Sequence, residues 1–282
     1  MSEASWPGGA RGALSLSFDN LGEAAEIELG AVAPETAGDH FTVTGVLPAL
    51  LAALAERELA ATFFVEGLNA ELYPEALAAI NAAGHEVAYH AWRHEQWADL
   101  SASEQAENLA RGLTAFRELG LEPGGLRPPG GGLGPGGLDV LREAGLRYCS
   151  PAGVGAGVED GVALLPFQWR HVDATCVLPP LAPVRESMTG STDPLDPGAF
   201  LTHLEAEIER LATAGGFTAI VLHLFMLDWL GEDRLGALFD SLAEAQRDDC
   251  LWLAPCRQTA QHMLERPAAF PPATALDQTS WG

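Results

Sequence analysis

Residues 61–89 read ATFFVEGLNAELYPEALAAINAAGHEVAY and contain one complete strand–helix–strand unit. Positions 61–65 are rich in the aromatic and β-branched residues that suit a buried strand. A helical pattern follows over about 72–83 and ends at Gly84, and positions 85–89 then predict the next strand. Strands that alternate with helices in this way pair side by side in a parallel sheet, so the unit indicates an α/β fold.

The same alternation continues on both sides of this unit. Ser101 and Glu104 form a capping-box pattern that opens one of the helices. No internal repeat is evident, so the pattern predicts one parallel sheet, either open or closed into a barrel. The expected strands lie near 13–18, 147–149, 162–165, 218–223 and 250–253, and the expected helices near 46–58, 101–119, 136–144, 199–212, 234–246 and up to 265.

The composition excludes several classes of function. The chain has 282 residues, and its 15 basic and 39 acidic side chains give a formal charge of −24. Every basic residue is Arg, so chemistry that needs a Lys amine, such as Schiff-base or pyridoxal-phosphate catalysis, is excluded. A chain with this much negative charge repels the phosphate backbones of nucleic acids and the anionic headgroups of lipids. We therefore expect no nucleic-acid or membrane partner.

The sequence also leads to expectations about the cellular location, a loop or lid and the C-terminal tail. The first residues lack a basic start followed by an apolar run, and no apolar stretch approaches the ~18 residues of a membrane span, so we expect a cytoplasmic protein. Residues 179–197 are rich in Pro, Ser and Thr, which predicts a long functional loop or lid. The tail from Pro267 is expected to be poorly ordered.

Polar residues follow two of the expected strands. Asp19 and Asn20 end the first strand, where ordinary turn chemistry is one explanation for them. His90 and His94 follow the 85–89 strand, four residues apart, and a chance surface pair is the alternative there. Because neutral imidazoles suit Zn²⁺ and similar ions, His90 and His94 are candidates for a metal site.

Three more polar residues are candidates for a functional site. Arg127 opens the sequence RPPGGG, whose prolines hold the Arg on a stiff turn. His223 ends the 218–223 strand, and Asp173 closes WRHVD. Each has an ordinary structural explanation: a Gly/Pro loop, a satisfied core histidine and a surface carboxylate.

Taken in order, these motifs resemble the polysaccharide deacetylase family, which has the NodB-homology fold and is carbohydrate esterase family 4. The resemblance spans roughly residues 14–263 and implies a distorted (β/α) barrel of one domain. We accordingly expect a catalytic domain over 1–266 and a C-terminal tail over 267–282. The motifs are SFDN at 17–20, GHEVAYHxxxH at 84–94, LRPPG at 126–130, VDA at 172–174 and IVLH at 220–223.

The resemblance implies catalytic roles for four residues. Asp19 corresponds to the general base of the family, and Arg127 to the arginine that orients this base. His223 corresponds to the general acid, and Asp173 to the carboxylate that pairs with it.

The resemblance also implies a divalent metal, most simply Zn²⁺, held by His90, His94 and Asn20. The family has an acidic residue where this chain has Asn20, so the site loses one negative charge. Glu23, three residues later, is an alternative source of that carboxylate. Position 91 departs as well, because it is Ala where the family usually has Ser or Thr.

The implied activity is metal-dependent hydrolysis of a non-peptide C–N bond. We expect an N-deacetylase or deformylase that acts on a small soluble N-acyl sugar or metabolite. Two alternatives stay open: an allantoinase- or imidase-like amidase that opens a ring, and a binding module that has lost its metal. The sequence leaves the oligomeric state open.

Overall fold

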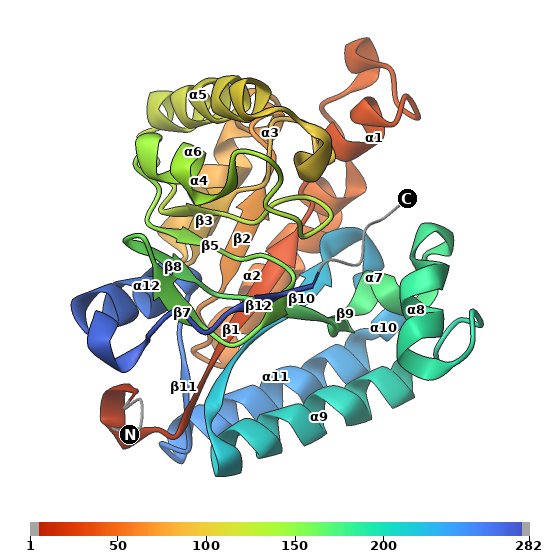
Figure 1. Cartoon of the computed structure of the whole chain (residues 1–282). Coiled ribbons are helices and arrows are strands. Elements are labelled where there is room, and N and C mark those ends of the chain that lie inside the picture. The colour runs from red at the N-terminus through yellow and green to blue at the C-terminus, as the bar shows by residue number, and fades with distance from the viewer. Residues whose placement is uncertain (1–5, 278–282) are drawn as a thin grey trace.

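The computed structural model describes residues 6–277, which form a curled sheet with helices around it (Figure 1). Most neighbouring strands are parallel, and β7 and β8 form an antiparallel pair. The ten strands of this sheet are β1 (Gly12–Asp19), β2 (Thr62–Val65), β3 (Glu86–Tyr89), β4 (Gly125–Leu126), β5 (Tyr148–Cys149), β7 (Gly157–Glu159), β8 (Val162–Leu164), β9 (Phe167–Val172), β10 (Gly216–His223) and β11 (Leu251–Leu253).

The two ends of the sheet come back together. The strand order is β7-β8-β5-β4-β3-β2-β1-β10-β9, with β11 beside β1. The chain passes from β8 to β9 across Leu165 and Pro166, and Phe167 at the start of β9 forms a parallel bridge with Ala152, just beyond β5. The predicted distorted (β/α) barrel is therefore confirmed.

Helices cover the outside of the sheet. Figure 1 shows α9 and α11 side by side along one edge and α4, α5 and α6 on the opposite side. The longer helices are α2 (Leu47–Glu56), α4 (Pro74–Ala82), α5 (Ala102–Glu118), α6 (Gly137–Glu143), α8 (Ala182–Thr189), α9 (Pro197–Ala214), α11 (Glu232–Arg247) and α12 (Cys256–Glu265). The shorter ones are α1 (Ala24–Glu28), α3 (Leu68–Leu72), α7 (Asp173–Val177) and α10 (Leu227–Leu230).

The predicted capping box at the start of α5 is confirmed. The Ser101 hydroxyl accepts the amide N–H of Glu104 at 3.4 Å, and the Glu104 carboxylate accepts the amide N–H of Ser101 at 2.8 Å. This reciprocal pair satisfies two amides that lack partners within the helix, a contribution of about 1 kcal/mol.

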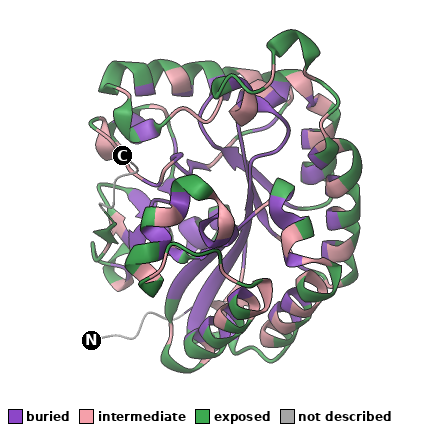
Figure 2. Ribbon diagram, turned by 90° about the vertical axis from the view of Figure 1, so that its right-hand side faces the viewer, coloured by how far each residue is buried: buried purple, intermediate pink, exposed green. Residues whose placement is uncertain are grey.

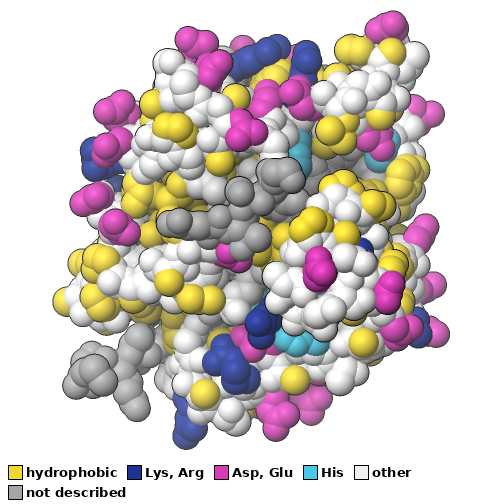
Figure 3. Space-filling view, turned by 45° about the vertical axis from the view of Figure 1, so that its right-hand side comes forward, with side chains coloured by type: hydrophobic (Ala, Val, Ile, Leu, Met, Phe, Trp, Pro, Cys, Tyr) yellow, Lys and Arg dark blue, Asp and Glu magenta, His cyan; other side chains and the backbone are white. Residues whose placement is uncertain are grey.

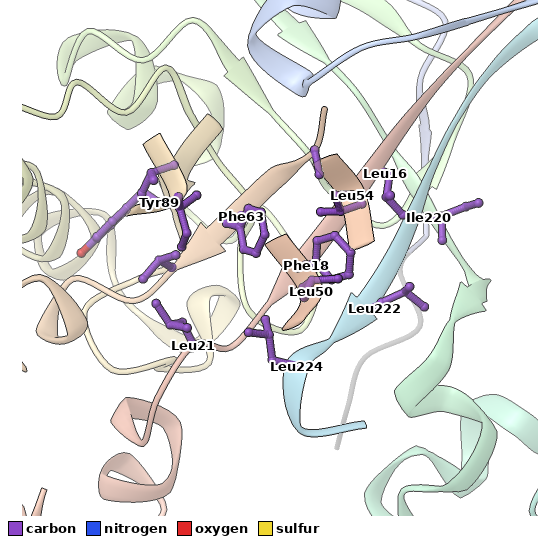
Figure 4. Packing of buried hydrophobic residues seen from close by; sticks show 14 of the residues in the cluster. Leu16, Phe18, Leu21, Leu50, Leu54, Phe63, Tyr89, Ile220, Leu222 and Leu224 are labelled. Atoms are coloured by element: carbon purple, nitrogen blue, oxygen red, sulfur yellow. The ribbon is translucent and has the colours of Figure 1, made fainter. Parts of the chain in front are cut away.

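The central strand β1 is buried on both faces, and its apolar residues alternate with the buried polar residues Ser15, Ser17 and Asp19. Leu16 and Phe18 face the outer helices, where Phe18 stacks on Phe63 with ring centroids 5.0 Å apart (Figure 4). Side chains alternate along a strand, so Ser17 and Asp19 point to the inner face. Figure 2 shows the consequence for the whole molecule: buried strands inside and exposed helix faces outside.

Two segments differ from the sequence expectation. Residues 167–172 form β9, although their apolar pattern is interrupted by Gln168 and Arg170. The expected loop over 179–197 contains helix α8, which begins beside Pro183 and ends at Gly190 in a left-handed conformation. These two residues are standard helix start and stop signals, and the expected loop is therefore helical over Ala182–Thr189.

The expected poorly ordered tail is packed against the barrel as far as Asp277. Phe270 is buried, and its carbonyl accepts the amide N–H of Val158 at 2.9 Å. Strand β12 (Ala275–Leu276) pairs antiparallel with β6 (Gly153–Val154). The expectation of disorder is therefore wrong for 267–277, and the rest of the predicted tail lies outside the described residues.

Gly112 in α5 provides a test of this packing. A Cβ atom at Gly112 would lie 2.1 Å from a ring carbon of Tyr89, which is buried beneath it. We expect Gly112→Ala to lower the free energy of unfolding by about 1–3 kcal/mol because the core becomes overpacked. Gly236→Ala in α11 is the matched control, since its Cβ meets only an arginine tip at 3.6 Å, and it should be neutral or slightly stabilising. Urea denaturation measures both; equal effects would contradict this packing.

Candidate active site

The polar residues singled out from the sequence meet at the carboxyl ends of the strands. Asp19 and His223 are the last residues of β1 and β10, and they lie opposite each other in the register of these two strands. His90 directly follows β3, Arg127 follows β4 and Asp173 follows β9. Parallel strands end on the same side of a sheet, so five segments far apart in sequence deliver their side chains to one place.

Asp19 and Arg127 form a buried ion pair. Arg127 Nη1 donates to Asp19 Oδ1 at 2.6 Å and to the Ser17 hydroxyl at 2.8 Å. The other side of the guanidinium donates to the Ser150 hydroxyl, and its central carbon lies 4.1 Å from the centre of the Phe64 ring. These contacts fix Arg127, and Arg127 in turn fixes the orientation of the Asp19 carboxylate.

His90 and His94 are neighbours, with ring centroids 4.9 Å apart. Burial lowers the pKa of each to about 3, so both imidazoles are neutral at neutral pH. His90 Nδ1 lies 2.7 Å from the carbonyl oxygen of Arg127 and must donate to it, because a carbonyl only accepts. Nε2 of His90 is therefore the lone-pair nitrogen, and it lies 3.9 Å from Asp19 Oδ2.

The backbone around these side chains is left-handed at three positions. The φ angles are +58° at Asn20, +63° at Ala91 and +75° at His94. Such a conformation is unfavourable for residues other than Gly, at a cost of order 1–3 kcal/mol each. The three residues lie together at one site. The placement of their side chains there must therefore compensate for the free-energy cost of the left-handed backbone.

His223 is tied to Asp173 through both its ring and its backbone. His223 Nδ1 lies 2.6 Å from Asp173 Oδ1, and the His223 amide N–H donates to Asp173 Oδ2 at 2.8 Å. Burial alone would lower the pKa of His223, but the charge of Asp173 and its hydrogen bond outweigh burial, and the pKa is raised. The pair can therefore hold a proton on the ring at neutral pH.

Glu66 is a site residue that the sequence reasoning missed. It directly follows β2, is fully buried, and accepts the side-chain N–H groups of Asn20 at 2.6 Å and Asn69 at 2.9 Å. Burial raises its pKa to about 8, with a smaller contribution from the charge of Asp19. The signal was present, because Glu66 stands at a strand end like Asp19 and His90.

Glu23 does not replace the missing carboxylate. Its two oxygens accept the hydroxyl of Tyr73 and the amide N–H of Gly38, so it braces the loop after β1. That alternative from the sequence is therefore wrong.

The two histidines are suited to a divalent ion, although the described residues offer no third His, Cys, Asp or Glu ligand beside them. The two neutral imidazoles are ready ligands, and the Nδ1 anchor of His90 is the kind of outer contact that orients a metal-binding histidine. Within residues 6–277, no three His, Cys, Asp or Glu side chains are grouped so as to hold a metal. Asn20, the third position that the resemblance implies, offers a neutral amide oxygen and lies in the same loop as Asp19.

The surface agrees with the acidic composition. On the face shown in Figure 3, Asp and Glu side chains are spread among neutral groups. In the part of the chain that the structure describes, no helix has the length and apolar character to cross a bilayer.

Comparison with known proteins points to one family. The family model described as polysaccharide deacetylase matches residues 14–149. A peptidoglycan-N-acetylglucosamine deacetylase of Bacillus cereus is 31% identical over 101 residues, which are 36% of this chain and 47% of that relative. The chain therefore spans less than half of that relative's length.

Two solved structures share the whole fold. A candidate polysaccharide deacetylase from Mycobacterium smegmatis superimposes with a TM-score of 0.77 at 27% identity, covering 97% of both chains. The Puue allantoinase superimposes with a TM-score of 0.74 at 19% identity, covering 95% of both chains, which shows a common fold.

Proposed function

We propose that this chain, which is similar to polysaccharide deacetylases, hydrolyses the C–N bond of a small N-acyl compound, such as an N-acyl sugar. The products would be a carboxylic acid and a free amine. One observation supports this most strongly: Asp19 and His223 lie side by side at the ends of paired strands, each held by its own buried partner. Amide hydrolysis needs such a base and acid on two sides of one carbon.

Asp19 is the proposed general base. Its Oδ1 is held by Arg127, which leaves Oδ2 on the side of His90 to take a proton from the attacking water. Arg127 is a positioning residue in this scheme, because it acts through the orientation of Asp19.

His223 is the proposed general acid. Its Nδ1–H is directed to Asp173, so Nε2 is the nitrogen that can give a proton to the departing amine. An amide nitrogen leaves poorly unless it is protonated, and the carboxylate of Asp173 favours the protonated ring that this step requires.

We propose that His90, His94 and the side-chain oxygen of Asn20 bind a divalent ion, with Zn²⁺ the choice that the imidazoles favour. When bound, such an ion polarises an acyl carbonyl and lowers the pKa of water. The neutrality of both histidines supports this role.

The depth of the site supports a small substrate. Asp19, His90 and Asp173 are each less than 5% exposed. A short acyl group such as acetyl or formyl can enter between them more readily than a bulky one. We also propose a cytoplasmic location, which cell fractionation would test.

A panel of soluble N-acetyl, N-formyl and cyclic amide compounds tests the proposal. Mass spectrometry should find the acyl group lost from an N-acyl compound and the free amine in equal amount. A product that gains water without losing a fragment would instead establish the ring-opening activity. Binding without turnover of any compound would favour the binding module.

The pairing of His223 with Asp173 predicts a pH effect. Because the acid must be protonated, turnover falls as pH rises through the raised pKa of His223. Asp173→Asn removes the charge that raises this pKa, so the basic limb of the kcat profile should move to lower pH. Asp228→Asn, at an exposed carboxylate on α10, is the control and should leave the profile in place. An unmoved basic limb in Asp173→Asn would remove His223 from the acid role.

A further inference from the structure

Glu66 is a carboxyl buried beside the site, where two side-chain amides contact it. Asn20 Nδ2 donates to Glu66 Oε1 at 2.6 Å and Asn69 Nδ2 donates to Oε2 at 2.9 Å. A carboxyl shut away from water in this way destabilises the fold unless its contacts compensate. Its presence at a strand end therefore calls for a role in the site.

The segment that carries Glu66 is tied to the histidine loop. The amide N–H of Gly67 donates to the carbonyl of Ala91, and the amide N–H of Leu68 donates to the carbonyl of Trp92, both at 2.9 Å. A Cβ atom at Gly67 would lie only 2.7 Å from the Trp92 ring, so the two loops are in close contact. Glu66 is thus held between the loop of Asn20 and the loop that carries His90 and His94.

Asn69 holds the other side of the same arrangement. Its side-chain amide donates both to Glu66 and to the carbonyl oxygen of Leu21, the residue after Asn20. Glu66 and Asn69 together therefore anchor the left-handed turn at Asn20 by its side chain and by its backbone.

The contact with Glu66 determines which atom of the Asn20 side chain is available. Asn20 Nδ2 donates to Glu66 Oε1, so the NH₂ group of Asn20 faces Glu66. The amide is planar, and its carbonyl oxygen is then the branch turned away from Glu66. Without this contact, nothing in the hydrogen bonds of Asn20 would fix which branch of its amide points away from position 66.

We propose that Glu66 is a positioning residue that orients Asn20 so that its oxygen, together with His90 and His94, can bind a divalent cation. The inference rests on the proposed metal site, and it explains how a chain with Asn20 keeps three ligands. The carboxyl group then stands at position 66 instead of position 20, where it would act on the site through its hydrogen bond with Asn20. Outer contacts of this kind typically change metal affinity by about 10- to 100-fold.

Calorimetric titration of the full chain with Co²⁺ as the probe tests the inference without relying on turnover. We expect Glu66→Gln to weaken Co²⁺ binding about 10- to 100-fold. The Gln amide can offer Asn20 either its oxygen or its NH₂ group, so it no longer fixes which branch of the Asn20 amide points away from position 66. Glu86→Gln is the matched control. Glu86 is also buried, but it starts β3 at the opposite end of the sheet, where it accepts from Thr62, Tyr148 and the Arg257 amide. Glu86→Gln should leave Co²⁺ affinity unchanged even if it lowers stability.

The double variant Asn20→Asp with Glu66→Gln reverses the hydrogen bond, since the amide now stands at position 66 and the carboxylate at position 20. It should bind Co²⁺ at least as tightly as the wild type. The inference is overturned if Glu66→Gln binds like the wild type, if Glu86→Gln is equally weakened, or if the double variant binds no better than Glu66→Gln. A wild-type chain that binds no Co²⁺ overturns the metal site and this inference together, and acyl release measured separately then decides the hydrolase proposal.

Discussion

Replacing Asp19 by Asn is expected to lower kcat by about 10²- to 10⁴-fold while the chain stays folded. The side chains have the same shape, and Arg127 can still donate to the amide oxygen, so the local structure has little reason to change. What disappears is the ability to take a proton from water. KM should change far less than kcat, because the proton moves only in the transition state.

Asp240→Asn is the matched control for this experiment. Asp240 also pairs with an arginine, Arg57, at 2.7 Å, but both side chains lie on the surface of the helical layer. Its loss should leave kcat unchanged. Turnover of Asp19→Asn at the wild-type rate would remove Asp19 from the mechanism.

Replacing Arg127 by Met is expected to lower the free energy of unfolding by about 3–5 kcal/mol, the cost of leaving one partner of a buried ion pair unpaired. Arg127 is 1% exposed, and Met fills much of its length without offering a hydrogen bond. Asp19 would then be buried beside an apolar side chain. Urea denaturation at neutral pH measures the loss.

Two comparisons separate the pairing from the general effect of changing a buried residue. Arg57→Met breaks the exposed pair with Asp240 and should cost about 0–1 kcal/mol. Adding Asp19→Asn to Arg127→Met removes the stranded charge, so the double variant should be more stable than Arg127→Met alone. Strictly additive losses would show that the two residues do not stabilise each other.

Much of the fold follows from local patterns in the sequence. The segment from 61 to 89 has strong strand residues, a helical pattern and a glycine stop, and the structure places β2, α4 and β3 there. The ends of the expected strands also indicate where Asp19, His90 and His223 meet, because parallel strands bring their carboxyl ends together.

The remainder depends on contacts that no local pattern contains. Strand β9 carries polar residues and is a strand because it pairs with β10 and bridges back to Ala152. The tail pairs with β6, more than 100 residues earlier in the chain, in an antiparallel register that sets Ala275 opposite Val154. Glu66 reads as the first residue of a loop, and its role appears only when Asn20 is seen 2.6 Å away.

The most direct test of the central claim, that a water molecule breaks an acyl C–N bond at this site, is hydrolysis in water enriched in heavy oxygen. We predict that mass spectrometry will find one heavy oxygen atom in the released carboxylic acid, none in the amine, and the two products in equal amount. A released acid without the label, or no acid from any N-acyl compound of the panel, would contradict the account.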